Sequence, residues 1–436
     1  MGNIIFLAAE VLFIGAVIYI VPFFSAVLIT LFFLGFLYFW FERKEILYYL
    51  IPLLLLIRIF FTVNFNEIYP DEFIKIETKI VNSQGRIEKI DDKFPLGTMS
   101  IITEEVPDGK YILYGTMEKF GKNGFYYFHT IKKEEIPLNR FEIFFNNRLK
   151  TLRKYLSNKC GNLLQGVILG ERRYIYKEIR DKFIYSGSAH LLAISGLHIG
   201  AVTGIILWTV NLIKIKREIR YSLAFVFLTI YVLGISVSPS VIRAYIMGGI
   251  FLAGKIFYEK TDIRKSFAAA VIGNLFLYPD SAGKISFVLS YLCLFTIIYI
   301  YPKVSLKRKI KFVNILNFFI FTGVIQIFLI PVNLYFFKSI PFLSYFTNFF
   351  MTPIGMVFVT LGFVSFFVPE IVFAWFFAPI LQIIYNLMEI MLNFFSRIPY
   401  LIIKYDNNLS LKFIIFIYII LTALFYIKEI KKMKKI

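Results

Sequence analysis

Long apolar runs restrict the fold of this 436-residue chain more than any other feature. They recur along most of the sequence, each of roughly 20 residues, which is the length of a helix that crosses a bilayer. Charged residues make up 17% of the chain, against about 25% in a soluble domain. Because unpaired backbone groups are costly in lipid, separate apolar runs form helices. The sequence therefore predicts a polytopic α-helical membrane protein.

Basic residues cluster in some of the short breaks between these runs, at 42–45, 214–220, 259–265 and 303–311, and in the tail. The intervening breaks carry few. Positively charged loops stay in the cytoplasm, so this alternation predicts the topology, with both termini inside. Much of the net charge of +20 is then a topology signal, and the alternative is DNA binding at the inner face.

About 12 spans satisfy this alternation. We predict them at 3–20, 23–41, 46–63, 187–213, 221–237, 240–257, 267–279, 284–302, 312–331, 349–368, 371–391 and 411–428.

Residues 64–135 are polar and predict a small β-domain on the outer side of the membrane. In the stretch 73–81, apolar side chains and Thr78 alternate with charged ones, which is typical of a half-buried strand. Residues 111–131 read as a hairpin with Asn123-Gly124 at its turn. The aromatic run Phe125–Phe128 either stacks on exposed bases or fills the core of the domain. We expect His129 at its surface.

Residues 136–185 predict a basic amphipathic helical segment at the outer membrane surface. One apolar stripe at helical spacing runs from Phe141 to Val167, with basic residues on the other faces. Such a helix lies on anionic headgroups, or it forms a basic collar that attracts a polyanion. The two interpretations are compatible. The collar residues are Arg148, Lys150, Arg153, Lys154, Arg172 and Arg173.

Two of the three histidines lie in one short apolar stretch, "HLLAISGLHIG" at 190–200. Continuous helix here places His190 and His198 on one face, and aligns Gly196, Gly200 and Gly204 in a ridge that allows close helix approach. Polar groups at this depth usually face the protein interior or a water-filled cavity. The histidines either bond neighbouring helices or line an aqueous path. A metal site is a weaker alternative, because eight residues is a poor ligand spacing on a helix.

The same stretch resembles the signature of the ComEC family, the inner-membrane channel proteins of bacterial DNA uptake. Three further motifs follow in the family's order: "PSVIRAYIMGG" at 239–249, "SFVLSYL" at 286–292 and "TNFFMTP" at 347–353. Where the family's third motif has Gly and Gln, this sequence has Ser286 and Val288, which puts a polar contact there in question. The likeness covers the whole chain.

The resemblance implies a channel that passes one DNA strand across the cytoplasmic membrane. It implies an N-terminal three-span segment at 1–63, an OB-like fold for residues 64–135, a multi-span channel domain at 186–428 and a basic cytoplasmic tail at 429–436. The partners it implies are single-stranded DNA, the lipid bilayer, and a separate DNA receptor, nuclease and cytoplasmic helicase or motor. The pore or DNA-path candidates are His190, Ser195, Gly196, His198, Gly200, Arg243, Ser290 and Asn348.

Arg243 follows Pro239, which opens a span, so it either snorkels to the outer interface or meets phosphate at the pore mouth.

We expect no cofactor, no metal and no enzymatic activity in this chain. The metallo-β-lactamase-like domain of many family members needs a His-x-His-x-Asp-His cluster, and the three histidines lie elsewhere. No Gly-x-x-x-x-Gly-Lys-Ser/Thr phosphate loop is present either. Two other functions stay open: transport of another anionic envelope substrate, and an intramembrane enzyme that uses His190 and His198.

Overall fold

A computed structural model shows the fold of two compact units, each described by itself. The first unit takes the chain up to residue 180 together with 190–288 and 354–387, and the second takes 181–189, 289–353 and the chain from 388 onward. The structure describes residues 63–64, 73–81, 83–95, 99–103, 106–120, 125–278, 281, 284–306, 313–341, 344–398 and 403–404.

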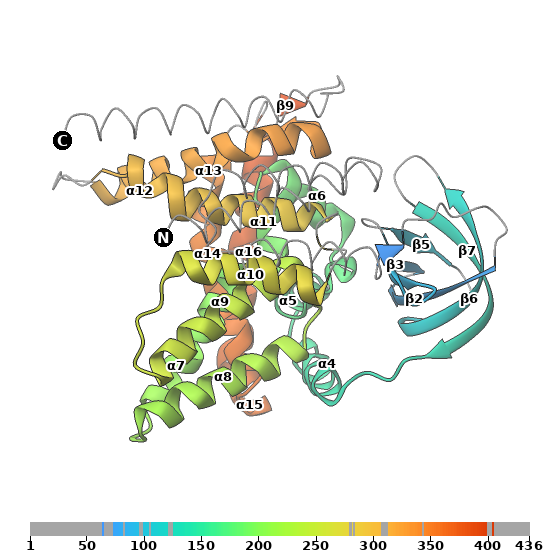
Figure 1. Ribbon diagram of the computed structural model, residues 1–436, viewed down its shortest axis with the longest axis horizontal. Coiled ribbons are helices and arrows are strands. Elements are labelled where there is room, and N and C mark those ends of the chain that lie inside the picture. The colour runs from blue at the N-terminus through green and yellow to red at the C-terminus, as the bar shows by residue number, and fades with distance from the viewer. Residues whose placement is uncertain are drawn as a thin grey trace, which may run out of the picture. The chain divides into compact units, whose positions relative to one another are not determined.

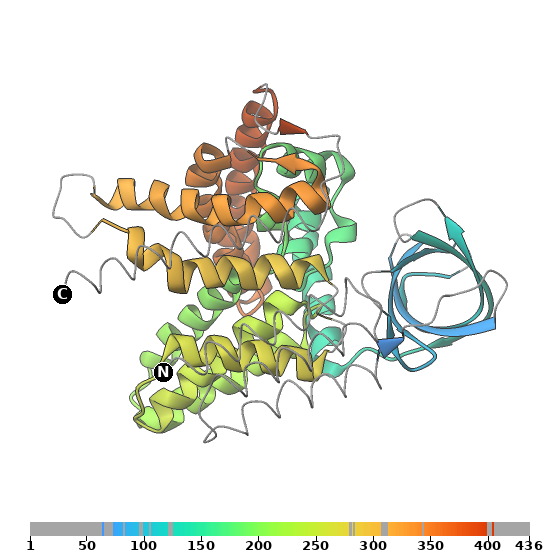
Figure 2. The same cartoon turned by 45° about the horizontal axis from the view of Figure 1, so that its top comes forward.

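Five strands of the first unit close into a barrel in the order β2-β3-β5-β7-β6 (Figures 1 and 2). β5 and β7 pair in parallel, and the other neighbours pair antiparallel. Beside the barrel, the two-residue strands β1 (Val63–Asn64) and β4 (Phe94–Pro95) pair in parallel. The barrel strands are β2 (Phe73–Val81), β3 (Gln84–Ile90), β5 (Ser100–Ile102), β6 (Gly109–Phe120) and β7 (Phe125–Glu135).

The barrel core confirms the predicted alternation. In β2, Ile74, Ile76, Thr78 and Ile80 are all buried, and the residues between them are partly exposed. The predicted hairpin is β6–β7, whose turn at 121–124 lies outside the described residues. From the aromatic run, Phe128 is fully buried in the core, so at least this ring fills the domain.

The segment 136–185 differs from the prediction of one surface helix. It forms α4 (Arg140–Arg153), α5 (Asn158–Leu169), the 3-10 helix η2 (Arg172–Tyr174) and α6 (Lys177–Tyr185). The predicted stripe is buried in both α4 and α5, but Ser157 caps a new helix and interrupts it. In α5 every residue from Cys160 to Leu169 is buried, so α5 packs inside the protein rather than on headgroups.

Four helices follow and pack against one another in the first unit: α7 (Gly196–Asn211), α8 (Arg217–Leu233), α9 (Pro239–Ile256) and α10 (Ile263–Leu277). Phe145 of α4 fits against Gly234 at the end of α8, where an added Cβ would come within 2.3 Å of its ring. The Phe145 ring also contacts Tyr231 and Phe366. These contacts join α4 to the end of α8 and to the residue after α14.

The second unit holds the later helices. They are α11 (Ile285–Phe295), the π-helix η5 (Thr296–Ile300), α12 (Tyr301–Val304), α13 (Val313–Phe337), the start of α14 (Ser344–Ser365) and the end of α16 (Ala378–Ser396). Two short strands, β8 (Ser339–Ile340) and β9 (Ile403–Lys404), pair antiparallel. The helix α15 (Glu370–Val372) and the π-helix η6 (Phe373–Phe377) lead into α16 within the first unit.

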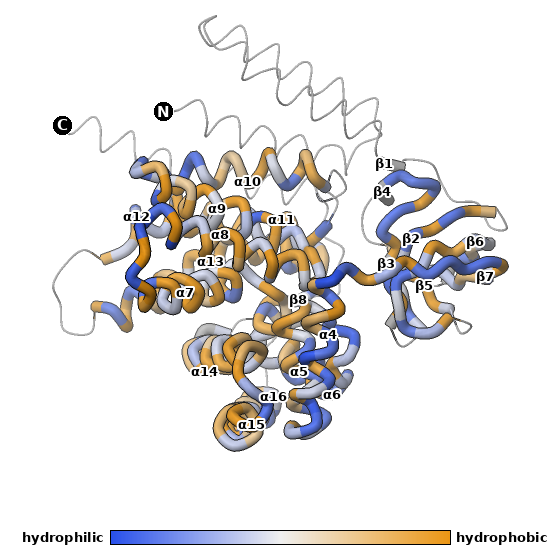
Figure 3. Tube along the Cα trace, turned by 90° about the horizontal axis from the view of Figure 1, so that it is seen from below, coloured by the Kyte–Doolittle hydropathy of each residue, from blue (hydrophilic) through white to orange (hydrophobic). Residues whose placement is uncertain are grey.

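Among the described residues, four helical stretches are long and apolar enough to cross a membrane, which supports a helical membrane protein. Figure 3 shows their apolar character against the mixed polarity of the barrel strands. These four stretches overlap the predicted spans at 284–302, 312–331, 349–368 and 371–391, whereas the predicted spans at 187–213, 221–237, 240–257 and 267–279 overlap the shorter helices α7 to α10. The spans at 3–20, 23–41 and 411–428, and the one at 46–63 except its last residue, lie outside the described residues, so the count of 12 stays a prediction.

Candidate functional site at the start of helix α7

The histidine stretch is not the continuous helix that we predicted. His190 lies in the 3-10 helix η3 (Ala189–Leu192), and α7 begins only at Gly196. Ser195 has extended backbone angles, φ −110° and ψ 170°, which ends any helical continuity from His190. The two histidines therefore do not share a helix face: His190 is exposed, and His198 is 1% exposed.

Ser195 and His198 form a reciprocal cap at the start of α7. The Ser195 hydroxyl accepts a hydrogen bond from the His198 backbone N–H, and the Ser195 backbone N–H donates to His198 Nδ1 at 3.1 Å. The Ser195 Oγ and His198 Nδ1 are 2.7 Å apart. This is a capping box in which histidine stands where Glu or Gln usually stands.

The cap determines the tautomer of His198. Nδ1 accepts from a backbone N–H, so in the neutral ring the proton is on Nε2. Nε2 is buried and has no hydrogen-bond partner within the described part of the chain. A buried donor without a partner costs about 1–3 kcal/mol.

Arg243 joins this helix start from α9. Pro239 is the first residue of α9, as the sequence predicted, and the structure adds Ser238 as its N-cap. An added Cβ at Gly196 would lie 2.8 Å from Arg243 Nη2, so the guanidinium rests directly against the first residue of α7. By contrast, a Cβ at Gly200 or Gly204 would meet no described atom within 4 Å. The predicted glycine ridge is therefore approached at Gly196 alone among the described residues.

Two further basic residues, Arg172 and His190, interact electrostatically with His198. Arg172 is exposed, on η2. The start of a helix carries a partial positive charge, and the Arg243 guanidinium against Gly196 adds to it. This arrangement suits an anion that accepts hydrogen bonds, phosphate above all.

Three of the six predicted collar residues bind the protein's own polar groups. Arg148 donates to the carbonyls of Phe366 and Val368, and Arg153 donates to Asn162 and Gln165. Arg173 donates to the carbonyls of Lys79 and Gln84 in the barrel. Lys150, Lys154 and Arg172 are exposed. The collar as a polyanion-binding surface stays a prediction.

Glu171 is a residue that the sequence analysis missed. Its buried carboxylate accepts from Lys79 of β2 and, at 2.6 Å, from the Ser236 hydroxyl before α9. Nearby, the Tyr174 hydroxyl donates to the carboxylate of Asp108, the residue before β6. Burial, reinforced by the charges of Asp108 and Glu171, raises the pKa of Tyr174 to about 12. A single Glu between helical segments gives no periodic pattern, so only the tertiary structure identifies it.

The two remaining candidates lie in the second unit. Ser290 is half-buried on α11, and Asn348 is half-buried in the first turns of α14. The side-chain oxygens of Thr347 and Asn348 are buried without a hydrogen-bond partner within the described part of the chain. Gln326 donates to the Ser344 hydroxyl at 3.0 Å, so the start of α14 is a polar region within an apolar unit.

Within the described ranges, no group of three or more His, Cys, Asp or Glu side chains is arranged to hold a metal ion.

Comparison with known proteins decides the family. The model of the "Competence protein" family matches residues 167–431, which is more than half of the chain. This chain belongs to the competence protein family. The matched region of this competence-family protein includes the α7 cap, Arg243, Ser290 and Asn348.

A curated relative is the ComE operon protein 3 of Bacillus subtilis (strain 168), 28% identical over 217 residues. The alignment takes in 48% of the competence-family chain and 27% of the relative, so it spans about a quarter of that protein. No solved structure matches.

Proposed function

We propose that this protein conducts single-stranded DNA across the cytoplasmic membrane during natural transformation. Family membership supports a role in DNA uptake, and the geometry at the start of α7 supports conduction of a polyanion. The observation that carries the proposal is the buried Nε2–H of His198, which has no partner in the described chain and belongs to the helix start against which the Arg243 guanidinium rests at Gly196.

Single-stranded DNA carries a negative charge on every nucleotide, so it needs fixed positive charge and hydrogen-bond donors along its path. The Arg243 guanidinium presents its planar donors to a phosphate, and the imidazole donates one further bond from Nε2. His190 and the N–H groups of the first residues of α7 extend this donor set. Such a set of donors binds each phosphate briefly and releases it as the strand moves through the path.

The barrel supports the same function. Its strand order, with the third and fifth strands in parallel, is the closed five-stranded arrangement that we take as an OB-like fold. We place it outside the cytoplasmic membrane, with both termini of the chain inside. The chain acts with a separate DNA receptor, nuclease and cytoplasmic motor. In the second unit, Ser290 and Asn348 are the candidate polar contacts for DNA.

The test follows strand-labelled duplex DNA in cells that carry wild-type protein, no protein, or one of two variants of His198. His198→Gln places an amide donor near the position of Nε2, whereas His198→Asn places its amide near Nδ1 and leaves no donor at Nε2. We expect His198→Asn to reduce strand entry about tenfold or more, the equivalent of one charge-assisted hydrogen bond, and His198→Gln to reduce it less.

The variants are compared at equal membrane abundance. Entry of label in cells without the protein would refute the conduction proposal, and the transport of another anionic envelope substrate would then be tested through envelope composition. Equal loss in both His198 variants would show a structural role for the whole ring rather than a role for Nε2.

A further inference from the structure

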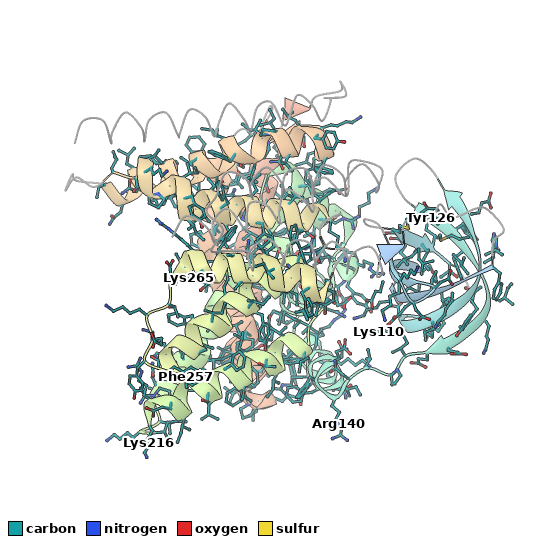
Figure 4. The ribbon with its side chains drawn as sticks, viewed as in Figure 1. Lys110, Tyr126, Arg140, Lys216, Phe257 and Lys265 are labelled. Atoms are coloured by element: carbon teal, nitrogen blue, oxygen red, sulfur yellow. The ribbon has the colours of Figure 1, made fainter. Side chains whose placement is uncertain are left out.

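Two loops of the first unit meet at one end of helices α7 to α10. The loop after α7 contains Lys216, and the loop after α9 begins at Phe257; Figure 4 shows both residues at this end. Arg217 lies 4.3 Å from the centroid of the Tyr258 ring, and the Tyr258 hydroxyl donates to the Glu218 carboxylate. Stacking and hydrogen bonding therefore join the loop after α9 to the first residues of α8, next to the loop after α7. We call the surface that these segments form the α7–α10 basic surface.

The second loop has a fixed conformation. The Glu259 N–H donates to the Gly254 carbonyl at 2.8 Å, and an added Cβ at Gly254 would lie 2.2 Å from the Thr261 side chain. Tyr258 itself has φ +60°, an uncommon value for a side chain of this size. This backbone persists because the surrounding contacts hold Tyr258 under Arg217.

The basic surface carries an excess of positive charge. Within 212–220 and 255–265 the chain has eight basic and three acidic residues, the acids being Glu218, Glu259 and Asp262. Asp262 is occupied as the N-cap of α10. Arg217 Nε is buried with no hydrogen-bond partner among the described residues. The basic residues are Lys214, Lys216, Arg217, Arg220, Lys255, Lys260, Arg264 and Lys265.

Large apolar side chains are exposed beside these charges. Trp208 is 66% exposed in the last turn of α7, and Phe257 is 73% exposed. Leu212, Ile213 and Ile263 are exposed as well. Aromatic and aliphatic residues bordering a basic cluster are typical of the interface between acyl chains and headgroups.

We propose that the α7–α10 basic surface binds the headgroups of anionic phospholipids. Arg217, oriented by the Tyr258 ring, presents its guanidinium edge to a lipid phosphate, and Lys214 and Lys216 add charge next to it. Trp208, Leu212 and Phe257 insert between the acyl chains of the same lipids. The site is separate from the donors at the start of α7 and does not depend on DNA conduction.

The aliphatic residues favour lipid over single-stranded DNA as the occupant. DNA-binding grooves alternate basic residues with aromatic rings, because bases stack on rings. Leu212, Ile213, Ile219 and Ile263 offer no stacking surface, and their exposure to water is unfavourable unless acyl chains cover them.

Quenching of Trp208 tests the proposal. The full-length protein with Trp40→Phe and Trp375→Phe retains Trp208 alone and is reconstituted into equal parts of phosphatidylglycerol and phosphatidylcholine. Bromine is placed on the acyl chains of one lipid or the other. We expect brominated phosphatidylglycerol to quench Trp208 more strongly than brominated phosphatidylcholine does. The affinity of the surface for phosphatidylglycerol, relative to phosphatidylcholine, should be roughly fivefold higher, which corresponds to one net basic contact.

The variant Lys214→Gln, Lys216→Gln, Arg217→Gln should bring the relative affinity close to one. The matched control Lys132→Gln, Lys133→Gln, Arg140→Gln removes the same charge from exposed positions on β7 and α4, and it should change nothing. If the triple variant fails to fold, the double variant Lys214→Gln, Lys216→Gln must still lower the affinity for phosphatidylglycerol relative to phosphatidylcholine.

Equal quenching by both lipids in the parent protein would overturn the proposal, and so would a loss of preference in the control. An oligothymidylate added to the same bilayers distinguishes the other occupant. If it abolishes the phosphatidylglycerol preference, the surface binds DNA and the lipid assignment is wrong.

Discussion

His198 differs from the other two histidines in the contacts of its ring nitrogens. His129 and His190 are exposed, whereas His198 is enclosed and its Nδ1 accepts from the Ser195 backbone. The spacing Ser-Gly-x-His is therefore a helix start, and the glycine next to the serine leaves room for Arg243. The chemistry of the site therefore depends on single atoms, Nδ1 and Nε2 of His198.

Gly196 and Gly200 form a matched pair for testing Arg243. In Gly196→Ala the methyl group would displace the Arg243 guanidinium, which lies 2.8 Å from the new atom, while the flexible end of that side chain allows the fold to persist. We expect strand entry to fall about tenfold, as for one charge-assisted hydrogen bond lost. Gly200→Ala meets no described atom within 4 Å, and strand entry should stay near wild type.

Entry of labelled DNA at equal membrane abundance is the measurement for this pair. Similar losses in both variants would show that helix flexibility, rather than the position of Arg243, limits conduction.

Individual elements of the first unit tolerate little added volume where backbones approach closely. Gly115 of β6 lies at a β-bulge, where the register with β7 shifts between Tyr114 and Gly115. An added Cβ there would lie 1.9 Å from the His129 carbonyl oxygen, which belongs to the neighbouring backbone. Neither strand can yield without opening the barrel.

Gly115→Ala should therefore destabilise the barrel by about 1–3 kcal/mol, the range for overpacked sites. Amide hydrogen exchange in β6 and β7 of the purified protein measures this as a loss of protection. Thr116→Ala, at the next position on the partly exposed face, should leave protection near wild type. Unchanged protection in Gly115→Ala would contradict the close approach of the two strands.

At the scale of the whole first unit, Glu171 links the barrel to the residues that precede helix α9. The Lys79 and Glu171 side chains are 21% and 8% exposed, so the ion pair is largely shielded from water. The same carboxylate bonds Ser236, three residues before Pro239, and α9 then carries Arg243. Barrel position and the α9 start are thus connected through one side chain.

We expect a double-mutant cycle of Lys79→Ala and Glu171→Ala to give a coupling energy of about 1–3 kcal/mol, as for contacting residues in one network. Amide hydrogen exchange in β2 measures the free energy of opening for the wild type, the two single variants and the double variant. The exposed pair Lys75 and Asp92 serves as a control, and its coupling should be smaller because water screens it. Additive effects of the Lys79 and Glu171 changes would show that they do not interact.

The sequence by itself determined the membrane class, the family motifs, the strand alternation of β2 and the opening of α9 at Pro239. Each depends on local periodicity or on a residue with a restricted backbone, so neighbouring residues suffice to specify it. The start of α7 after Ser195 is also specified locally. Histidine takes the place of the usual Glu in this capping box, so the pattern does not resemble a common helix start. Only the tertiary structure brought Arg243 to Gly196 and Lys79 to Glu171, because these contacts join residues from separate elements, and side-chain packing in three dimensions selects them.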